Sequence, residues 1–457
     1  MELRAHVLAV PIPGQGHLTP MLQLCKQLVS KGLKVTVALT RFVSSTTLDQ
    51  QKNQSQLNYN TISDGFDTGG YNDASSVENY FQRFEIAGTK TLTQLVKKQE
   101  SLGHPIDCII YDGHVPWALN VAKQFGILGA VYFTQPCAVD YIYYLVNRGL
   151  LSVPITSPCL IPGLPSMELR DIPTFVAKPE VYPGYFQVAI SQFSNVDEAD
   201  IVLVNTFYDL ENEVIDAMSK YIPLLTIGPT VPLSYLDNQI DKNEDKDYGV
   251  NLFHSNASIN IPHWLSTKPT GSVIYVSFGS MADLDEKQME ELAFGLKQSE
   301  FHFLWVVRES EQAKLPKEFV VETERGMIVN WCSQLDVLSS EAVGCFFTHG
   351  GWNSITEAMS LVVPMVVMPR WADQTTNAKF VEDVWRVGVR VNEDEDGFVT
   401  RDEIEKCIKG VMEKERSLEL KESAMRWKEL AKEALSVGGS SYNNIQAFVS
   451  QLTSSQA

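Results

Sequence analysis

The strongest constraint on the fold is a pattern that occurs twice along the chain, in which short apolar runs alternate with amphipathic helical segments. The first occurrence has apolar runs at residues 6–10 and 34–39, joined by the Gly-containing loop PIPGQGH and a helical pattern. The second begins with an apolar run at 272–278 and an amphipathic segment at 285–299. Alternating strands and helices are typical of parallel sheets covered by helices on both faces. The sequence therefore predicts an α/β protein with two doubly wound Rossmann-type domains facing a cleft.

The boundary between the two domains is indicated by a change of composition. The run SYLDNQIDKNEDKDYG is polar, charged and poor in residues that could form a core. We interpret it as a linker, although a solvated surface loop would have the same composition. The prediction is an N-terminal domain at 1–235, a linker at 236–260, a C-terminal domain at 261–436 and a final helical segment at 437–457.

Composition excludes several classes of function. The 457 residues include 37 basic and 56 acidic side chains, for a net charge of −19, which opposes binding to nucleic acid or to anionic membranes. No run approaches the roughly 18 unbroken apolar residues that span a membrane. The seven cysteines are scattered and form no CxxC pair, a pattern typical of reduced thiols. These features predict a cytoplasmic protein without stable membrane insertion, disulfides or a metal site.

The block at 331–374 combines side chains that suit the parts of a nucleotide. A flat base can stack on Trp331. A diphosphate can bind where a helix begins near Asn353 and Ser354, because free backbone N–H groups and the helix dipole favour anions there. Glu357, one turn later, can accept hydrogen bonds from ribose hydroxyls. Each of these residues alone has a structural explanation, but their joint spacing favours a nucleotide site.

The same block ends with Asp373 and Gln374, which can accept hydrogen bonds from the hydroxyls of a sugar. Base, ribose, diphosphate and sugar together describe a nucleotide sugar. The block WCSQLDVLSSEAVGCFFTHGGWNSITEAMSLVVPMVVMPRWADQ resembles the signature box of the plant UDP-glycosyltransferases over its full length. The resemblance extends along essentially the whole chain. It implies a GT-B-like fold, with acceptor binding in the N-terminal domain, UDP-sugar binding in the C-terminal domain and a last helix that packs back on the N-terminal domain.

The resemblance also implies a role for each residue of the donor site. The base would be held by Trp331 and Cys332, and the ribose by Gln334 and Glu357. The diphosphate would be held by Ser280, His349, Asn353 and Ser354, and the donor sugar by Trp352, Asp373 and Gln374. UDP-glucose is then a co-substrate and no cofactor is expected. Gln374 favours glucose over galactose, and the helix start with His349 is expected to take the diphosphate charge without a metal ion.

His17 and Asp112 are the candidate catalytic residues. An acceptor hydroxyl must lose its proton as it attacks the sugar, and a neutral histidine is a suitable base near pH 7. Taken alone, His17 could be an ordinary loop histidine, and Asp112 could cap the helix that follows its strand. The resemblance places His17 as general base and Asp112 as its partner. Gly14 and Gly16 could suggest a dinucleotide loop, but the glycine fingerprint is incomplete and no acidic residue follows the second strand.

Four positions depart from the pattern of the family. Ser340, Gly350, Val362 and Arg370 stand where His, Cys, Gly and Gln are usual. Gly350 is expected to loosen its loop, and Val362 is strained if its backbone has a positive φ. These departures motivate an alternative function, a catalytically weak or silent protein of the same fold that binds small molecules or UDP-sugars.

Aromatic residues are dense in the N-terminal half, and we expect Phe84, Tyr144 and Phe193 to line the acceptor pocket. A broad apolar pocket suits a multi-ring or aromatic acceptor better than a sugar. The favoured prediction is an inverting UDP-glucose-dependent glucosyltransferase of plant secondary metabolism. It would form β-glucosides or glucose esters of small hydrophobic metabolites such as terpenoids, steroids or phenolics.

Overall fold

The computed structural model describes residues 5–47, 56–237, 250–252, 260–317, 319 and 325–454, and these form two compact units. Unit 1 comprises the described residues up to Pro232, residues 250–252 and the residues from Glu433 on. Unit 2 comprises the rest, from Leu233 to Lys432. Each unit has one parallel sheet, which confirms the predicted pair of doubly wound α/β folds. Most of the predicted linker, 236–260, lies outside the described residues.

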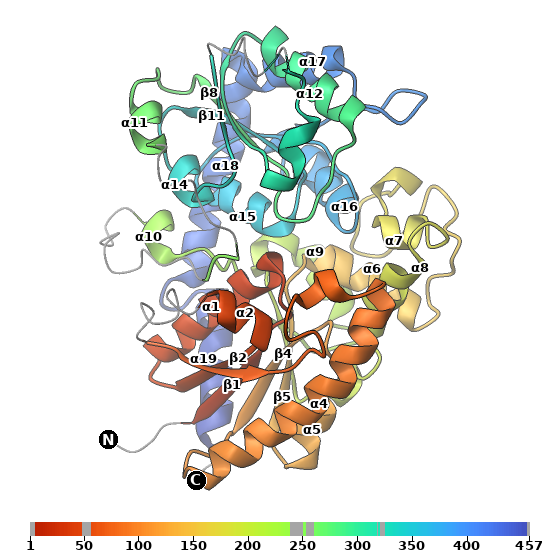
Figure 1. Ribbon diagram of the computed structural model, residues 1–457, viewed down its shortest axis with the longest axis vertical. Coiled ribbons are helices and arrows are strands. Elements are labelled where there is room, and N and C mark those ends of the chain that lie inside the picture. The colour runs from red at the N-terminus through yellow and green to blue at the C-terminus, as the bar shows by residue number, and fades with distance from the viewer. Residues whose placement is uncertain are drawn as a thin grey trace. The chain divides into compact units, whose positions relative to one another are not determined.

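Among the described residues of unit 1, seven parallel strands form a sheet in the order β3-β2-β1-β4-β5-β6-β7. Figure 1 labels β1, β2, β4 and β5 of this sheet. The strands are β1 (His6–Val10), β2 (Lys34–Thr40), β3 (Asn58–Ile62), β4 (Cys108–Asp112), β5 (Leu128–Phe133), β6 (Ile201–Val204) and β7 (Leu225–Thr226). The main helices are α1 (Gln15–Ser30), α2 (Arg41–Thr46), α4 (Val77–Ser101), α5 (Trp117–Gln124), α6 (Cys137–Asn147), α7 (Thr174–Ala177), α8 (Pro183–Ser191), α9 (Tyr208–Met218) and α19 (Ser440–Ser454).

The strands of unit 1 are apolar on both faces, as expected for a sheet covered by helices on both sides. Alternate residues such as Val7 and Ala9 of β1 pack with α1 in one core. Helix α19 completes this core with Ile445, Phe448 and Leu452. Its first turns are also tied to the segment at β7 by hydrogen bonds, from Ser441 Oγ to the carbonyl of Gly228 (2.6 Å) and from Asn444 Nδ2 to the carbonyl of Thr226 (2.9 Å).

The described residues of unit 2 form a six-stranded parallel sheet in the order β10-β9-β8-β11-β12-β13. The strands are β8 (Val273–Ser277), β9 (His302–Val306), β10 (Gly326–Val329), β11 (Val343–Thr348), β12 (Met365–Val367) and β13 (Gly388–Arg390). The main helices are α10 (Leu233–Leu236), α11 (Ile261–Ser266), α12 (Glu286–Gln298), α14 (Gln334–Leu338), α15 (Trp352–Ser360), α16 (Gln374–Lys379), α17 (Arg401–Met412) and α18 (Lys414–Leu435). Helices α12 and α17 pack against each other over one face of this sheet (Figure 1).

In each sheet, successive strands of the chain are added first on one side of the starting strand and then on the other, so the sheet has one reversal point. In unit 1 the reversal lies between β1 and β4, and in unit 2 it lies between β8 and β11. The carboxyl ends of the strands at such a point leave a crevice in which ligands bind. His17 follows β1 and Asp112 ends β4, whereas Ser280 follows β8 and His349 follows β11. The sheet topology therefore brings both predicted clusters to the positions where a site is expected.

The carboxyl end of α15 forms a Schellman turn. The N–H of Val362 donates to the carbonyl of Met359 (3.2 Å), and the N–H of Val363 donates to the carbonyl of Ala358 (2.9 Å). This turn requires a left-handed residue at position 362, and Val362 has φ 59°. The strain that the sequence predicted conditionally for Val362 is therefore present.

Two further features concern the cysteines and the apolarity of the helices. All seven cysteines are buried and free of disulfides. Within the described segments, no helix has the length and apolarity needed to span a bilayer.

Candidate functional site

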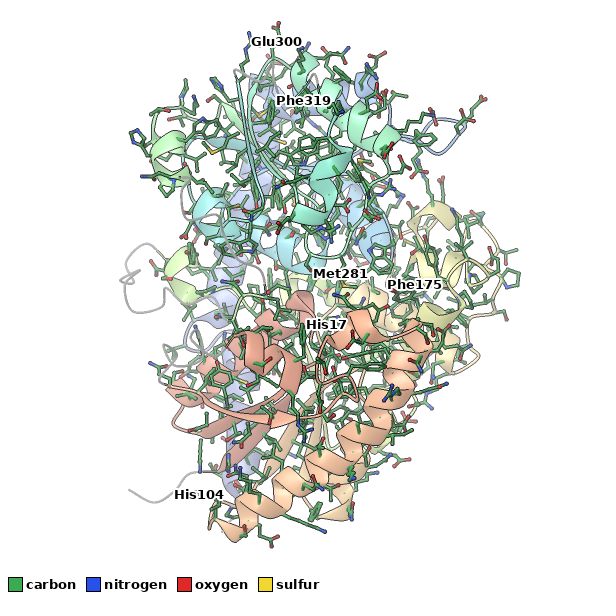
Figure 2. The ribbon with its side chains drawn as sticks, viewed as in Figure 1. His17, His104, Phe175, Met281, Glu300 and Phe319 are labelled. Carbon is green, nitrogen blue, oxygen red and sulfur yellow. The ribbon has the colours of Figure 1, made fainter. Side chains whose placement is uncertain are left out.

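The centre of the site in unit 1 is a hydrogen bond between His17 and Asp112. His17 lies in the first turn of α1, and Asp112 is the last residue of the neighbouring strand β4 (Figure 2 labels His17). The Nδ1 atom of His17 lies 2.8 Å from Oδ2 of Asp112. The hydroxyl of Thr134, which follows β5, lies 2.8 Å from the same nitrogen. The two residues expected to form a catalytic pair are thus in direct contact.

The carboxylate of Asp112 is fully buried and ionised. Burial raises its pKa, but the charge of His17 and the hydrogen bonds from His114 and His17 outweigh burial and hold the pKa well below its usual range. Its Oδ1 atom accepts from the backbone N–H of His114 (2.9 Å) and lies 3.0 Å from Nδ1 of the same histidine. Asp112 does not cap a helix, because α5 begins at Trp117 with Pro116 in the capping position. That alternative explanation was wrong.

An ionised acceptor beside Nδ1 determines the tautomer of His17. Nδ1 carries the proton that is donated to Asp112, so that Nε2 carries the lone pair that a general base needs. The ligand atoms of His17, Asp112 and His114 lie within 4.8 Å of one another, and such a group could also hold a metal ion. Both oxygens of Asp112 are already hydrogen-bonded to the two imidazoles, and this arrangement favours proton transfer chemistry.

His114 and Thr134 were not identified from the sequence. An aspartate that ends a strand and a histidine two residues later fit the spacing of an Asx turn, so the Asp-x-His pattern was an available signal for His114. Thr134 belongs to a different strand end, and its contact with His17 depends on the pairing of β5 with β4. Nothing in the local sequence indicated that contact.

In unit 2, Gln334 and Glu357, which are expected to contact the ribose, lie within one hydrogen-bonded network. Nε2 of Gln334 donates to Oε2 of Glu357 (2.8 Å) and to Oγ of Ser354 (3.0 Å). The hydroxyl of Tyr275, on β8, donates to Oε1 of Gln334 (3.3 Å) and lies 3.5 Å from Sγ of Cys332. The network orients a buried carboxylate and an amide from two different elements, α14 and α15.

Trp331 follows β10 and keeps part of its surface exposed, so it is not a fully buried core residue. A partly exposed indole can offer one face to a planar base. The neighbouring Cys332 is buried. Its role as a backbone contact to the base remains a prediction.

The residues predicted to contact the diphosphate surround the start of α15. The helix begins at Trp352, with Gly351 in the capping position, so the capping residue itself has no side chain to contribute. His349 lies between two glycines: a Cβ on Gly279 would approach its ring to 2.8 Å, and one on Gly351 to 2.6 Å. The close contacts explain why this pair of loops needs glycine.

The imidazole of His349 has a pKa well below its usual value. Burial, opposed by a hydrogen bond that the ring donates to the backbone of Ser277 and reinforced by the charge of Arg308, lowers the pKa of His349 to about 4. The imidazole is therefore neutral near pH 7 and can offer an N–H group but no positive charge. The expectation that His349 and the start of α15 together take up the diphosphate charge remains a prediction.

Arg308 is a third residue that the sequence analysis missed. It follows β9, and its guanidinium donates to the carbonyl of Ser280 (2.6 Å) and to the carbonyl of Ala282. Lys314 holds the next part of the same loop through Asp283 (2.5 Å) and the carbonyl of Leu284 (2.9 Å). These contacts fix the loop that carries Ser280 and place a cation close enough to affect His349.

The three residues predicted to bind the donor sugar have different surroundings. The side chain of Trp352 is buried against Trp385, with ring centroids 5.7 Å apart, so it packs in the core of unit 2. Asp373 is buried and accepts from Nδ2 of Asn377 (2.7 Å). Oε1 of Gln374 accepts from the backbone N–H groups of Arg370 (2.8 Å) and Trp371 (3.1 Å). Gln374 therefore uses its oxygen within the protein, and its NH₂ group is the part that can serve a sugar.

The expected acceptor residues lie in the packed interior of unit 1. Phe84 and Phe193 have no exposed surface, and Tyr144 is 5% exposed. Phe84 packs on Trp117 with ring centroids 5.4 Å apart, and Phe193 stacks on Phe133 at 4.7 Å. Side chains without exposed surface do not line a pocket, so the prediction for Phe84 and Phe193 is corrected to a core role. Aromatic density could not distinguish the two roles.

Gly350 also requires a correction. Its φ is +83°, a left-handed conformation, and a Cβ would approach Cγ1 of Val367 to 2.6 Å. Glycine therefore matches the backbone that this position adopts and does not simply loosen the loop. The side chain of Ser340 lies beside the N–H of Ala342 (3.4 Å), and Arg370 contributes its backbone N–H to Gln374.

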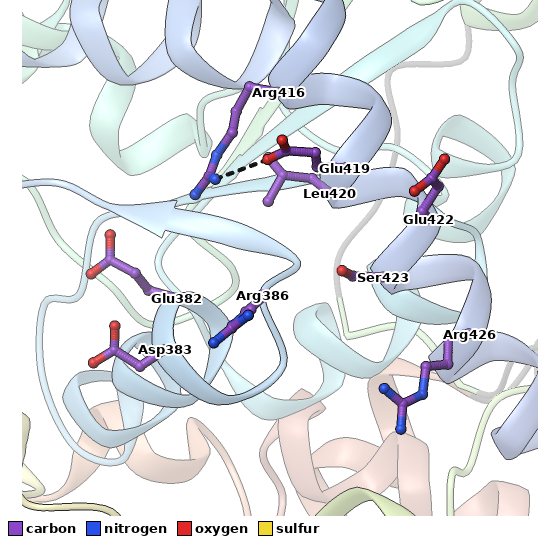
Figure 3. A pocket seen from close by; sticks show the side chains of 9 residues that line it. All are labelled: Glu382, Asp383, Arg386, Arg416, Glu419, Leu420, Glu422, Ser423 and Arg426. Atoms are coloured by element: carbon purple, nitrogen blue, oxygen red, sulfur yellow. Dashed lines mark hydrogen bonds and ion pairs between the residues drawn. The ribbon is translucent and has the colours of Figure 1, made fainter.

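Unit 2 also has a cavity of about 620 Å³ that contains none of these residues (Figure 3). It lies between α18 and the π-helix η5 (Phe380–Val384), and charges of both signs line it, with Arg416 paired to Glu419 at 3.2 Å. The remaining lining residues are Glu382, Asp383, Arg386, Leu420, Glu422, Ser423 and Arg426.

Comparison with known proteins identifies the class. Residues 242–434 match the family described as "UDP-glucoronosyl and UDP-glucosyl transferase". The chain is 49% identical to flavonol 7-O-beta-glucosyltransferase UGT74F1 of Arabidopsis thaliana, over 99% of both proteins. It is 43% identical to a mogroside I-E synthase of Siraitia grosvenorii, over 98% of both. Among solved structures, Os79 from O. sativa in complex with UDP superposes with a TM-score of 0.93 at 39% identity, covering 98% of this chain and 100% of Os79.

Two parallel α/β sheets with sites at their reversal points, together with these similarities, define a GT-B glycosyltransferase. The chain belongs to the plant UDP-glycosyltransferases and is an enzyme of that family, a hexosyltransferase that uses a UDP-sugar.

Proposed function

We propose that this enzyme transfers glucose from UDP-glucose, with inversion, to small hydrophobic plant metabolites and forms β-glucosides or glucose esters. The observation that supports the reaction best is the contact of 2.8 Å between Nδ1 of His17 and Oδ2 of Asp112. The names of the similar proteins, a flavonol glucosyltransferase and a mogroside synthase, support small-molecule acceptors. A cytoplasmic location fits seven cysteines that are free and buried.

In the proposed mechanism, Nε2 of His17 takes the proton of the acceptor hydroxyl while the oxygen attacks the anomeric carbon. The new C–O bond forms as the bond to UDP breaks, so that the configuration changes from α to β. Asp112 stabilises the imidazolium that forms, because it is ionised, buried and directly hydrogen-bonded to His17. The proton stays on His17 until solvent removes it after the products leave.

In unit 2, the donor would be held by several kinds of group. Trp331 would stack on the base, Gln334 and Glu357 would bind the ribose, and the first turn of α15 with Ser280 would bind the diphosphate. Because His349 is neutral, Arg308 would supply positive potential behind the Ser280 loop. Asp373 and Gln374, which come after β12 in the chain, would contact the donor sugar.

The test is UDP release from UDP-glucose with pooled terpenoid, steroid, phenolic and carboxylic acceptors, comparing the wild type with His17→Ala. General base catalysis typically contributes about 10²–10⁴-fold to the rate. The wild type should release UDP with at least one alcohol or phenol, and His17→Ala should lose at least about a hundredfold in kcat while its affinity for UDP is retained. A variant that keeps more than about a tenth of the activity would reject His17 as the base.

A second candidate function is that of a binding protein with little or no turnover. The strain at Val362 and the unusual residues Ser340 and Arg370 favour it. The hydrogen-bonded pair His17 and Asp112 counts against it, because a silent protein has no need to keep a base oriented. UDP binding without UDP release across the whole acceptor pool would support this second function.

A further inference from the structure

The carboxylate of Asp112 lies between two imidazoles, and the proposed reaction needs only one of them. His17 approaches Oδ2, and His114 approaches Oδ1 from the loop after β4. The two rings also meet edge to face, with centroids 4.8 Å apart and an interplanar angle of 84°. We propose that His114 is a positioning residue for the base, which holds Asp112 so that Oδ2 is directed at His17. This inference rests on the proposed role of His17.

The contacts of Oδ1 show how His114 would act. The backbone N–H of His114 donates to Oδ1 (2.9 Å), and the ring Nδ1 lies 3.0 Å from the same atom. The backbone bond alone leaves the carboxylate free to rotate about its last torsion, which is broad for an aspartate. A second donor to the same oxygen, the ring Nδ1–H of His114, restricts the rotation of the carboxylate. His114 therefore limits the rotation that would carry Oδ2 away from His17.

For this role, His114 must stay neutral and carry its proton on Nδ1. Burial lowers the pKa of His114, the hydrogen bond that its ring donates to Asp112 opposes this, and the charge of His17 lowers the pKa further. A neutral His114 can remain beside His17 when that ring becomes cationic during transfer, whereas a second cation would oppose proton uptake. The ring is held by its surroundings, with Phe81 at 6.3 Å between centroids.

The titratable groups around Asp112 come from three elements. His17 comes from α1, His114 from the loop after β4, and Tyr132 from β5, where it pairs in register with Asp112. Burial raises the pKa of Tyr132 well above its usual value, so that it stays neutral. Thr134 adds a hydroxyl that does not titrate. The side chains that contact Asp112 directly are therefore the imidazoles of His17 and His114.

The experiment compares two amides of similar size at position 114. In His114→Asn the side-chain NH₂ falls where Nδ1 of the imidazole lies, whereas in His114→Gln it falls near Nε2. The assay measures kcat and KM for an alcohol or phenol and for a carboxylic acid. Retained UDP affinity and an unchanged melting temperature establish that each variant is folded. His114→Leu, which has no donor, is the third variant.

We expect His114→Asn to keep kcat within about threefold of the wild type, and His114→Gln and His114→Leu to lose about 10–100-fold with an alcohol or phenol. The carboxylic acid is already ionised and should lose much less. Loss of the donor concentrates the charge of Asp112, so that His17 holds its proton more tightly. The acid limb of the profile of kcat/KM against pH should therefore move to higher pH in the Gln and Leu variants.

Equal losses in the Asn and Gln variants would overturn the proposal, because they would show that the ring volume matters and the Nδ1 donor does not. A change confined to the acceptor KM would overturn it too, since His114 would then act only as part of the pocket. Full activity of His114→Leu would reject the proposal while leaving the function of His17 intact. No UDP release by the wild type itself would instead reject the proposed function.

Discussion

Replacing Val362 by glycine should stabilise unit 2. Val362 occupies the left-handed position of the Schellman turn that ends α15, with φ 59°. A left-handed conformation costs an L-residue about 1–2 kcal/mol, and the branched Cβ of valine places it at the upper end of that range. Glycine removes this strain and keeps both backbone hydrogen bonds of the turn.

Two effects oppose the gain. Glycine loses about 0.5–1 kcal/mol through the greater freedom of the unfolded chain. The side chain of Val362 is partly exposed, so deleting it forfeits only a fraction of the roughly 1.5 kcal/mol that a fully buried valine contributes. The strain that is relieved exceeds these losses by about 0.5–1 kcal/mol, which corresponds to a rise in Tm of about 1–4 °C for a unit of this size.

The assay is differential scanning calorimetry with and without UDP, in which the transition of unit 2 is the one that UDP shifts. Glu300→Gly is the matched control, because Glu300 follows α12 with φ 63°, is exposed and has no branch at Cβ. The rise in Tm caused by Glu300→Gly should be smaller than the rise caused by Val362→Gly. If Val362→Gly lowers Tm while Glu300→Gly raises it, the reasoning from backbone strain is wrong for this turn.

Four other predictions follow from the two sites. Phe84→Ala and Phe193→Ala should each destabilise unit 1 by about 3–5 kcal/mol, measured by urea unfolding, because both rings are fully buried; a stable variant with altered acceptor preference would contradict this. Arg308→Gln should raise the KM for UDP-glucose several-fold, and Arg308→Lys should restore little, because one ammonium cannot reach both carbonyls; an unchanged KM would show that the clamp is dispensable. The kcat/KM for UDP-glucose should exceed that for UDP-galactose, and Gln374→His should lower the ratio of the two values. Equal values in the wild type would refute the preference. EDTA should leave activity undiminished, and a loss that Mg²⁺ reverses would refute the metal-free donor site.

The alternation of strands and helices was sufficient to predict both sheets and the place of each cluster. In a doubly wound sheet the ends of β1 and β4 must be neighbours, so the contact between His17 and Asp112 follows from topology once the strands are recognised. The predicted boundaries of the elements were close to the observed ones. For example, α15 begins at Trp352, one residue before the expected start. The predicted roles of the donor residues remain predictions.

Properties that depend on burial and on long-range contacts could not be predicted. The neutrality of His349 depends on how deeply its loop is covered and on Arg308 from another strand end. The core positions of Phe84 and Phe193 depend on which faces of their segments pack inwards, and aromatic content does not report this. The hydrogen bond that Oε1 of Gln374 accepts from the N–H of Arg370 depends on the turn that precedes α16.

Helix α19 has a consequence for biosynthesis, because it supplies part of the core of unit 1 from a position after unit 2 in the chain. At about 5–20 residues per second, the roughly 200 residues between Pro232 and Ser440 take about 10–40 s to translate. During that interval the sheet of unit 1 lacks Ile445, Phe448 and Leu452, and the apolar surface that they cover remains open to chaperones. The half of the enzyme that is made first is therefore the half that is completed last.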